Sequence, residues 1–152
     1  MKLSIYIIMV LFYQMAIGQN KTETIQWITE KFDAYKNPLE GKTEIRNDYI
    51  YRIGSDELRV KIKNIKKIAI KKSSYNSVDY ATIELMFDAG KLEYKENKDP
   101  EFKISKNESD KKISLIVLPN FLTDGLKERM EKALVHLVKL SGGNAVIYKE
   151  TF

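Results

Sequence analysis

The hydrophobic pattern beyond residue 19 opens with a helical segment. Four apolar side chains recur at three- and four-residue spacing and so share one face of a helix: Ile25, Ile28, Phe32 and Tyr35. Asn20 and Glu23 make a capping-box pair at its start. Pro38 marks its end, because proline disfavours the helical conformation in the residue before it. We therefore expect an amphipathic helix that begins at Asn20 and ends near residue 37.

The middle of the chain has the two-residue period of half-buried strands. The clearest case is residues 58–63, where Leu58, Val60 and Ile62 alternate with Arg59, Lys61 and Lys63. Residues 80–87 are apolar on both faces, which indicates a central strand. Residues 73–77 are predicted as a loop, and residues 88–91, with Gly90 suited to a positive φ, as a hairpin turn. We expect about seven strands, at residues 45–53, 58–63, 68–72, 80–87, 92–94, 102–104 and 113–118.

A second amphipathic helix follows the strands. One apolar stripe recurs at three- and four-residue spacing, and it consists of Leu122, Leu126, Met130, Ala133, Leu137 and Leu140. Gly142 and Gly143 supply the stop. The short apolar tail at residues 145–148 either adds a strand or packs under the sheet. The predicted fold class is α+β, mainly antiparallel, with an N-terminal helix and a C-terminal capping helix.

The first eighteen residues have the pattern of a secretory signal peptide. Lys2 provides the positive start, residues 3–12 are almost wholly apolar, and Ala16 and Gly18 are small residues at the positions that a signal peptidase reads. The run is shorter than the roughly 20 apolar residues of a spanning helix. We expect cleavage after Gly18, a single domain over residues 19–152 with no transmembrane segment, and a secreted or periplasmic location.

Composition narrows the chemistry. The chain has no cysteine, which excludes thiol catalysis, thiolate metal sites and disulfides. Its formal net charge is +5, and one less once Lys2 has left with the leader. Lysine greatly outnumbers arginine, a bias common in proteins from AT-rich bacterial genomes. Nucleic-acid sites favour arginine for its planar fork, so we expect no nucleic-acid partner.

The order of the elements resembles that of pleckstrin-homology-like domains. In that family about seven short strands form an open-ended barrel, and a C-terminal helix covers one end. Residues 43–140 resemble this arrangement. The chain is also similar to small secreted bacterial proteins of unknown function that end a final helix in Gly-Gly. The alternative architecture is a plain antiparallel sheet with both helices on one face.

Basic side chains are the candidate binding residues. Arg59, Lys61 and Lys63 alternate along one predicted strand, and Lys66, Lys67, Lys71 and Lys72 follow closely. The family resemblance implies an anion site at the end of its first strand and along its second, which corresponds to Arg52, Arg59 and Lys61 here. We therefore take Arg52, Arg59, Lys61 and Lys63 as a candidate anion site. The alternative is a solvated sheet face whose lysines block aggregation.

Other chemistry-bearing residues give weaker signals. His136 is the single histidine, so it lacks histidine or cysteine partners for a metal and is interpreted as a boundary residue of the second helix. Five tyrosines fall in or near predicted strands and either fill the sheet or form a ligand surface: Tyr49, Tyr51, Tyr75, Tyr80 and Tyr94. Of these, Tyr75 lies in a polar stretch and is expected to be exposed.

These patterns favour a non-enzymatic module. The sequence contains no glycine-rich phosphate loop, no Gly-x-Ser-x-Gly and no His-Glu-x-x-His, and its acidic residues are scattered. We expect a secreted binding or structural module, without cofactor or metal, that recognises an anionic surface or a partner protein. The alternative is a hydrolase acting on the cell envelope, or an enzyme inhibitor.

Overall fold

A computed structural model describes residues 20–38, 41–96 and 101–149 of the chain. Residues 20–34 form a helix, called the leading helix below. The signal peptide predicted for residues 1–18 lies outside the described residues. The remaining elements are β1 (Lys42–Arg46), β2 (Tyr49–Ile53), β3 (Glu57–Lys61), the 3₁₀ helix η1 (Ile62–Asn64), β4 (Ile65–Tyr75), β5 (Val78–Phe87), β6 (Leu92–Lys95), β7 (Lys103–Ile104), β8 (Lys112–Val117), α2 (Asn120–Thr123), α3 (Leu126–Leu140) and β9 (Val146–Ile147).

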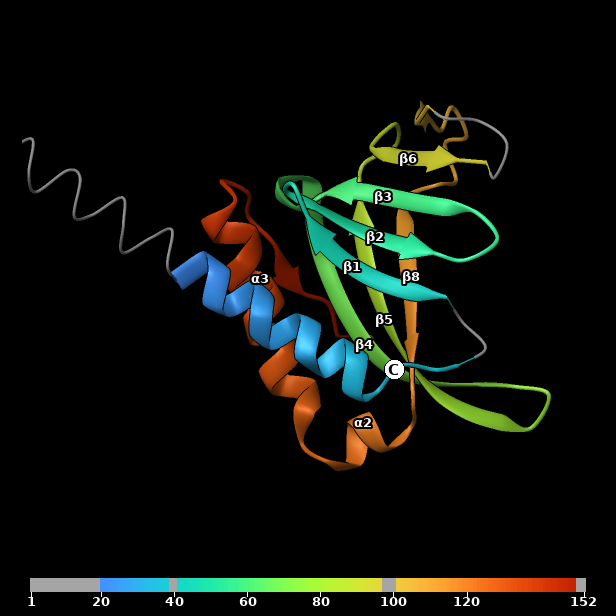
Figure 1. The fold of residues 1–152 in the computed structure, drawn as a ribbon, viewed down its shortest axis with the longest axis vertical. Coiled ribbons are helices and arrows are strands. Elements are labelled where there is room, and N and C mark those ends of the chain that lie inside the picture. Colours follow the sequence, from blue (N-terminus) through green and yellow to red (C-terminus); the bar gives the residue numbers. More distant parts are fainter. Residues whose placement is uncertain (1–19, 39–40, 97–100, 150–152) are drawn as a thin grey trace, which may run out of the picture.

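The strands form two sheets (Figure 1). The five-stranded sheet has the order β1-β2-β3-β6-β7 and is antiparallel throughout. The four-stranded sheet has the order β8-β5-β4-β9, and only β9 runs parallel to its neighbour. The predicted α+β class with mainly antiparallel strands is confirmed. The described residues hold nine strands where about seven were predicted, and these strands form two sheets and no closed barrel. The likeness to a pleckstrin-homology domain remains a prediction.

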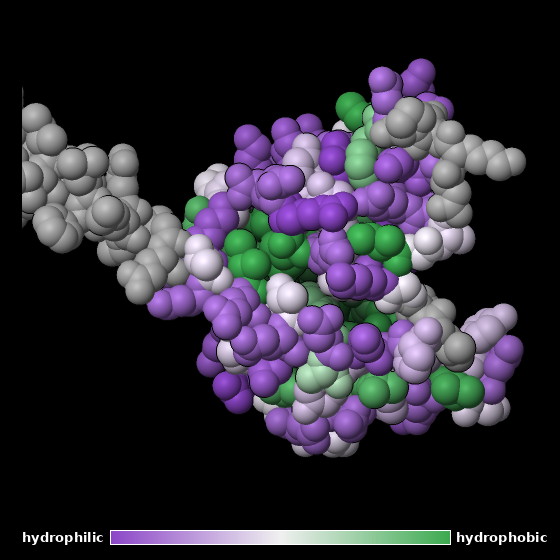
Figure 2. Space-filling model, viewed as in Figure 1, coloured by the Kyte–Doolittle hydropathy of each residue, from purple (hydrophilic) through white to green (hydrophobic). Residues whose placement is uncertain are grey.

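One shared core holds the two sheets and the helices together. Ile28 and Phe32 of the leading helix are buried in the same cluster as Ile50 and Val60 of the five-stranded sheet. The four-stranded sheet contributes one face to this cluster, through Ile68, Ile70, Ile83, Leu85, Ile113 and Leu115. Figure 2 shows hydrophilic residues over most of the viewed surface, with hydrophobic residues gathered in the hollow between the helices and the strands. Burial of this kind supplies most of the driving force for folding.

Two tight turns lie where the sequence predicted other structure. Asn47 and Asp48 have φ values of 50° and 62°, so the single strand predicted over residues 45–53 is in fact the hairpin of β1 and β2. Asn76 and Ser77 have φ values of 48° and 63° and join β4 to β5, so the predicted loop at residues 73–77 is mostly strand. Left-handed turns of two residues match the twist of the strands they connect. They usually carry glycine, and neither turn here does.

Two further predictions about the strands are wrong. Gly90 has the expected positive φ of 70°, but residues 88–91 lead from one sheet to the other and are not a hairpin turn. The reason is that β5 already has β4 and β8 on its two edges. The strand predicted to reach residue 63 ends at Lys61, because Ile62 turns into the core through η1. Residues 80–87 do form a central strand, as predicted, and the tail adds the strand β9.

The second helical segment is interrupted. Gly125 has a φ of 67°, which ends α2 and starts α3, so the predicted helix over residues 122–140 is two helices. Leu134 and Val138 are buried on α3, whereas Ala133 and Leu140 of the predicted stripe are only half-buried. Leu126, Met130 and Leu137 of that stripe are buried, so the buried face is the predicted one, and it continues through Leu134 instead of Ala133. Glu131 is also buried, and burial raises the pKa of its carboxyl.

The leading helix contacts α3 through a side-chain hydrogen bond. The Oδ1 of Asn20 lies 2.7 Å from the Nε2 of His136, on an exposed part of α3. Asn20 is itself helical, so it does not occupy the capping position that the sequence predicted. Its side-chain oxygen is used between the two helices. His136 of α3 therefore has a hydrogen-bond partner on the leading helix.

Gly143 allows the end of α3 to pack against η1. A methyl group at this position would lie 2.5 Å from the backbone oxygen of Lys63 and 2.8 Å from Cγ1 of Val138. These distances are well inside van der Waals contact, and the first atom belongs to backbone that cannot rotate away. Gly142, just before it, has a φ of 79° and terminates the helix in the left-handed conformation.

We predict that Gly143→Ala lowers the free energy of unfolding by about 1–3 kcal/mol, the usual cost of overpacking. The measurement is urea-induced unfolding of the mature chain. Gly54→Ala is the matched control, because no atom lies within 4 Å of the methyl group it would add. Equal stability of the two variants would contradict the close approach of residue 143 to η1.

Candidate functional site

Each sheet has one face that points away from the shared core. On the five-stranded sheet this face carries Arg59 and the residues that alternate with it, and we call it the arginine face: Lys42, Glu44, Arg46, Tyr49, Tyr51, Glu57, Arg59, Lys61, Glu93 and Lys95. The outward face of the four-stranded sheet carries the residues that alternate with the core residues along each strand. We call it the lysine face, and it includes Lys67, Ala69, Lys71, Tyr75, Val78, Tyr80, Thr82, Glu84, Met86, Lys112, Ser114, Ile116, Val146 and Tyr148. Both faces are candidate binding surfaces.

The structure separates the four basic residues that the sequence grouped. Arg52 lies opposite Thr43 and Leu58 in the register, whereas Arg59 lies opposite Tyr51 and Glu93. Because successive side chains point to opposite faces of a sheet, Arg52 and Arg59 are on different faces. Lys61 shares the arginine face. Lys63 belongs to η1, and it lines a hollow of about 360 Å³ together with Lys61 and Tyr49.

Arg59 is enclosed by partners of its own sheet. Its Nε and Nη2 lie 2.7 and 2.6 Å from Oε2 of Glu93, and its Nη1 lies 3.3 Å from the hydroxyl of Tyr51. The guanidinium stacks 3.6 Å from the ring centroid of Phe102. Burial opposes the charged form, but the bonds to Glu93 and Tyr51 outweigh it and hold the pKa of Arg59 above its usual value. The positive charge of Arg59, which the sequence suggested for a ligand, is therefore paired with Glu93 within the sheet.

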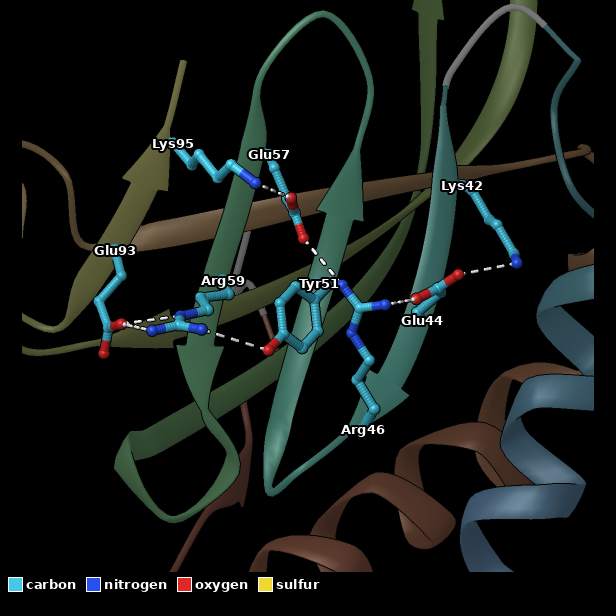
Figure 3. Close-up of polar contacts among 8 residues, drawn as sticks. All are labelled: Lys42, Glu44, Arg46, Tyr51, Glu57, Arg59, Glu93 and Lys95. Atoms are coloured by element: carbon cyan, nitrogen blue, oxygen red, sulfur yellow. Dashed lines mark hydrogen bonds and ion pairs between the residues drawn. The ribbon is translucent and has the colours of Figure 1, made fainter. Parts of the chain in front are cut away.

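Most of the remaining charges of the arginine face are also paired, the exception being Lys61, whose Nζ lies 5.6 Å from the ring centroid of Tyr49. Figure 3 shows the pairs. Arg46 lies between Glu44, at 2.9 Å, and Glu57, at 3.0 Å, with its guanidinium over the ring of Tyr51. Lys42 contacts Glu44 at 2.8 Å, and the hydrogen bond from this lysine is the main reason why the pKa of Glu44 is lowered. Carboxylates thus alternate with cations across the face. An anionic ligand would meet these carboxylates as well as the cations, which disfavours binding here.

The lysine face has a different balance of charge. Glu84 lies at its centre and is 8% exposed, with Lys112 and Lys71 at 2.8 and 3.3 Å from its two carboxylate oxygens. Burial opposes its ionisation, but the hydrogen bond and charge of Lys112 and the charge of Lys71 prevail, so the pKa of Glu84 lies below its usual value. Lys67 stands over the ring of Tyr148, with its Nζ 5.3 Å from the centroid.

Four lysines converge at the end of the four-stranded sheet where β4 and β8 begin: Lys67 and Lys112 of the lysine face, and their sequence neighbours Lys66 and Lys111. We call this site the lysine hollow. Lys66 and Lys67 of β4 and Lys111 and Lys112 beside and within β8 line a hollow of about 360 Å³, which also contains Met86, Phe87, Asp88 and Ser109. Within the described part of the chain, Lys66 and Lys111 are exposed and have no ion-pair partner. Asp88 is the single carboxylate in the lining. The lining of the hollow therefore combines excess positive charge with two apolar residues, Met86 and Phe87.

The sequence pointed to half of this site. Lys66 and Lys67 belong to the run of lysines that the pattern singled out. Lys111 and Lys112 reach the same hollow because β8 pairs with β5, placing Lys112 opposite Met86 in the same row as Lys67. Sequence periodicity predicts strands but not which strands are neighbours. No local signal could therefore have joined residues 66–67 to residues 111–112.

Another hollow lies at the edge formed by β6 and β7. Its volume is about 1310 Å³, and its apolar lining consists of Leu58, Leu92, Tyr94, Phe102 and Ile104. Its rim mixes charges of both signs: Asp56, Glu96, Lys103, Lys106 and Asp110. The hydroxyl of Ser105 donates to Asp110 at 2.6 Å. A lining of mixed charge does not select a ligand by its charge.

Other candidate residues have ordinary surroundings. Tyr75 is 71% exposed, as predicted, while Tyr51 is buried and the other strand tyrosines are half-buried. Among the residues that the structure describes, no three histidine or carboxylate side chains gather in a way that could hold a metal ion. No helix in the described ranges is both long enough and apolar enough to cross a bilayer.

Comparison with known proteins gives no relative for this chain. Neither a protein-family model, nor a curated protein, nor a solved structure matches it. The site must therefore be interpreted from its own geometry.

We predict that Glu84→Gln lowers stability at neutral pH by about 1 kcal/mol, since the partners of this buried carboxylate are themselves partly exposed. The folded pKa is depressed, so the contribution of Glu84 is fully present above the unfolded pKa of about 4.3 and is lost as the pH falls through the folded pKa. Thermal unfolding from pH 7 to pH 2 tests this.

In that titration the wild-type and Glu84→Gln stabilities should converge at the acid end. Glu108→Gln is the control, because Glu108 is exposed in a turn and should unfold like the wild type at every pH. A constant difference between wild type and Glu84→Gln down to pH 2 would show that the ion pairs of Glu84 do not contribute in the way proposed.

Proposed function

We propose that this protein is an exported, non-enzymatic module that binds an anionic partner through its lysine face. The observation that carries the proposal is the hollow in which Lys66, Lys67, Lys111 and Lys112 converge from two strands. The pattern of the first eighteen residues supports export. The absence of recognisable catalytic motifs supports a binding role over an enzymatic one.

Charge distribution favours the lysine face over the arginine face. On the arginine face Glu44, Glu57 and Glu93 each contact at least one cation. In the lysine hollow Lys66 and Lys111 have no such partner among the described residues, so a ligand need not displace an existing ion pair. Charged groups that lie close together raise the local concentration of counter-ions, and this effect weakens with salt.

The shape of the hollow fits an anionic group attached to an apolar or neutral body. Met86 and Phe87 form part of its lining, and Met86 is half-buried, so some apolar surface remains accessible beside the ammonium groups. The hydroxyl of Ser109 is also in the lining, but it already donates to Oδ1 of Asn107 at 2.8 Å, so the lysine ammonium groups are the donors left for an oxyanion. Lysine binds such groups as a point charge with rotatable donors, which suits ligands of variable geometry.

A pair of charge-matched variants tests this proposal. Lys66→Glu/Lys111→Glu changes the lysine hollow, and Lys61→Glu/Lys63→Glu changes the group predicted from the sequence by the same net charge. The measurement is the salt concentration at which each mature protein elutes from immobilised dextran sulfate. We predict that the Lys66/Lys111 variant elutes at clearly lower salt than the Lys61/Lys63 variant, because it loses direct contacts and not only net charge.

Circular dichroism and thermal unfolding of both variants provide the control for folding. All four lysines are exposed, so both variants should fold. Equal shifts in elution for the two variants would contradict the proposal, since net charge alone would then explain retention. A larger shift for the Lys61/Lys63 variant would place the anion site on the arginine face.

A further inference from the structure

The lysine face also carries most of the exposed apolar side chains of the described chain. Six large hydrophobic residues are strongly exposed, and four of them belong to this face: Tyr75 at 71%, Val78 at 62%, Val146 at 55% and Tyr148 at 43%. Tyr75 and Val78 are register partners at the tip of the β4–β5 hairpin. Val146 is the register partner of Lys67 at the opposite edge.

These side chains lie at the margins of the face, and the charged groups lie between them. Tyr75 and Val78 mark one end and Val146 and Tyr148 one edge, while Lys71, Glu84 and Lys112 occupy the centre. Protein–protein interfaces usually have the reverse order, with an apolar core inside a polar rim. A second copy of the chain is also disfavoured, because a two-fold interface would bring two positively charged faces together.

We propose that the lysine face docks on the anionic headgroups of a lipid bilayer, with the Tyr75–Val78 tip and Tyr148 placed at the interface. This inference rests on the proposed function and names its partner. Lysine can lay its aliphatic stem along apolar surface while its ammonium reaches a phosphate. Tyrosine is suited to the level of the headgroups, because its ring is apolar and its hydroxyl is polar.

The β4–β5 hairpin provides the geometry for such contact. It joins β4 to β5 through Asn76 and Ser77, and the residues around the turn are exposed. Lys72 and Asp79, which contact each other at 2.6 Å, alternate with Tyr75 and Val78 and so lie on the opposite side of the hairpin. Contact by a few interfacial side chains together with several lysines gives reversible binding that depends on lipid charge and on salt.

Vesicle co-sedimentation tests the inference. The probes are vesicles of phosphatidylcholine alone and vesicles of equal parts phosphatidylcholine and phosphatidylglycerol. We expect the mature protein to bind only the anionic vesicles. Tyr75→Ser/Val78→Ser removes the apolar tip without changing the charge, and we expect it to bind these vesicles about tenfold more weakly. Ile104→Ser is the control, because Ile104 is similarly exposed but lies on the five-stranded sheet.

Elution from dextran sulfate separates failure of this inference from failure of the proposed function. If Tyr75→Ser/Val78→Ser keeps its retention on dextran sulfate but loses vesicle binding, the bilayer is the supported partner. If wild type and this variant bind vesicles equally, or neither binds, the bilayer inference is overturned. A wild type that ignores vesicles yet depends on Lys66 and Lys111 for retention would leave the anion site in place and point to an acidic protein.

Discussion

Every feature of this molecule depends on one constraint, which is that each sheet has a single face available to the shared core. The alternation of side chains along a strand assigns each residue to one side or the other. Ile68, Ile70, Ile83 and Leu85 take the inner side of the four-stranded sheet and are packed with the buried residues of the leading helix and α3. Their neighbours in sequence are then forced outward, whatever their chemistry.

The two outward faces differ in how far their charged side chains are paired. The arginine face is closed by its own pairs, since Arg59 is held by Glu93, Tyr51 and Phe102. Such pairs hold neighbouring strands in register and leave little unpaired charge. The lysine face has Glu84 as its central carboxylate, and Lys66 and Lys111 are left without ion pairs in the described ranges. Residual positive charge and exposed apolar side chains therefore gather on the same sheet.

Much of the fold was predictable, because periodicity reports how each residue is buried. The leading helix, the strand at residues 58–61, the central strand near residues 80–87 and the presence of a C-terminal helix all follow from that signal. The turns at Asn47-Asp48 and Asn76-Ser77 were missed because neither contains glycine, although asparagine and aspartate tolerate a positive φ better than other side chains do. Leu134 was missed although it lies four residues after Met130 on the same buried face of α3, because the predicted stripe continued through Ala133 instead.

The candidate site was less predictable than the fold. Arg52 and Arg59 are close in sequence but lie on opposite faces, because the tight connection between β2 and β3 sets their register. Lys67 and Lys112 are 45 positions apart in the numbering and come together only through the order β8-β5-β4. Pairing of distant strands depends on the whole core, and no short stretch of sequence encodes it.

The most direct test of the account uses the absence of cysteine from the chain. Single cysteines placed along β4 at positions 67, 68, 70 and 71 can be labelled with a maleimide reagent under native conditions, with Ser55→Cys as an exposed reference. We expect position 67 to react nearly as fast as the reference, position 71 to react more slowly but clearly, and positions 68 and 70 to be strongly protected. Equal reactivity at all four positions, or the opposite alternation, would contradict the account.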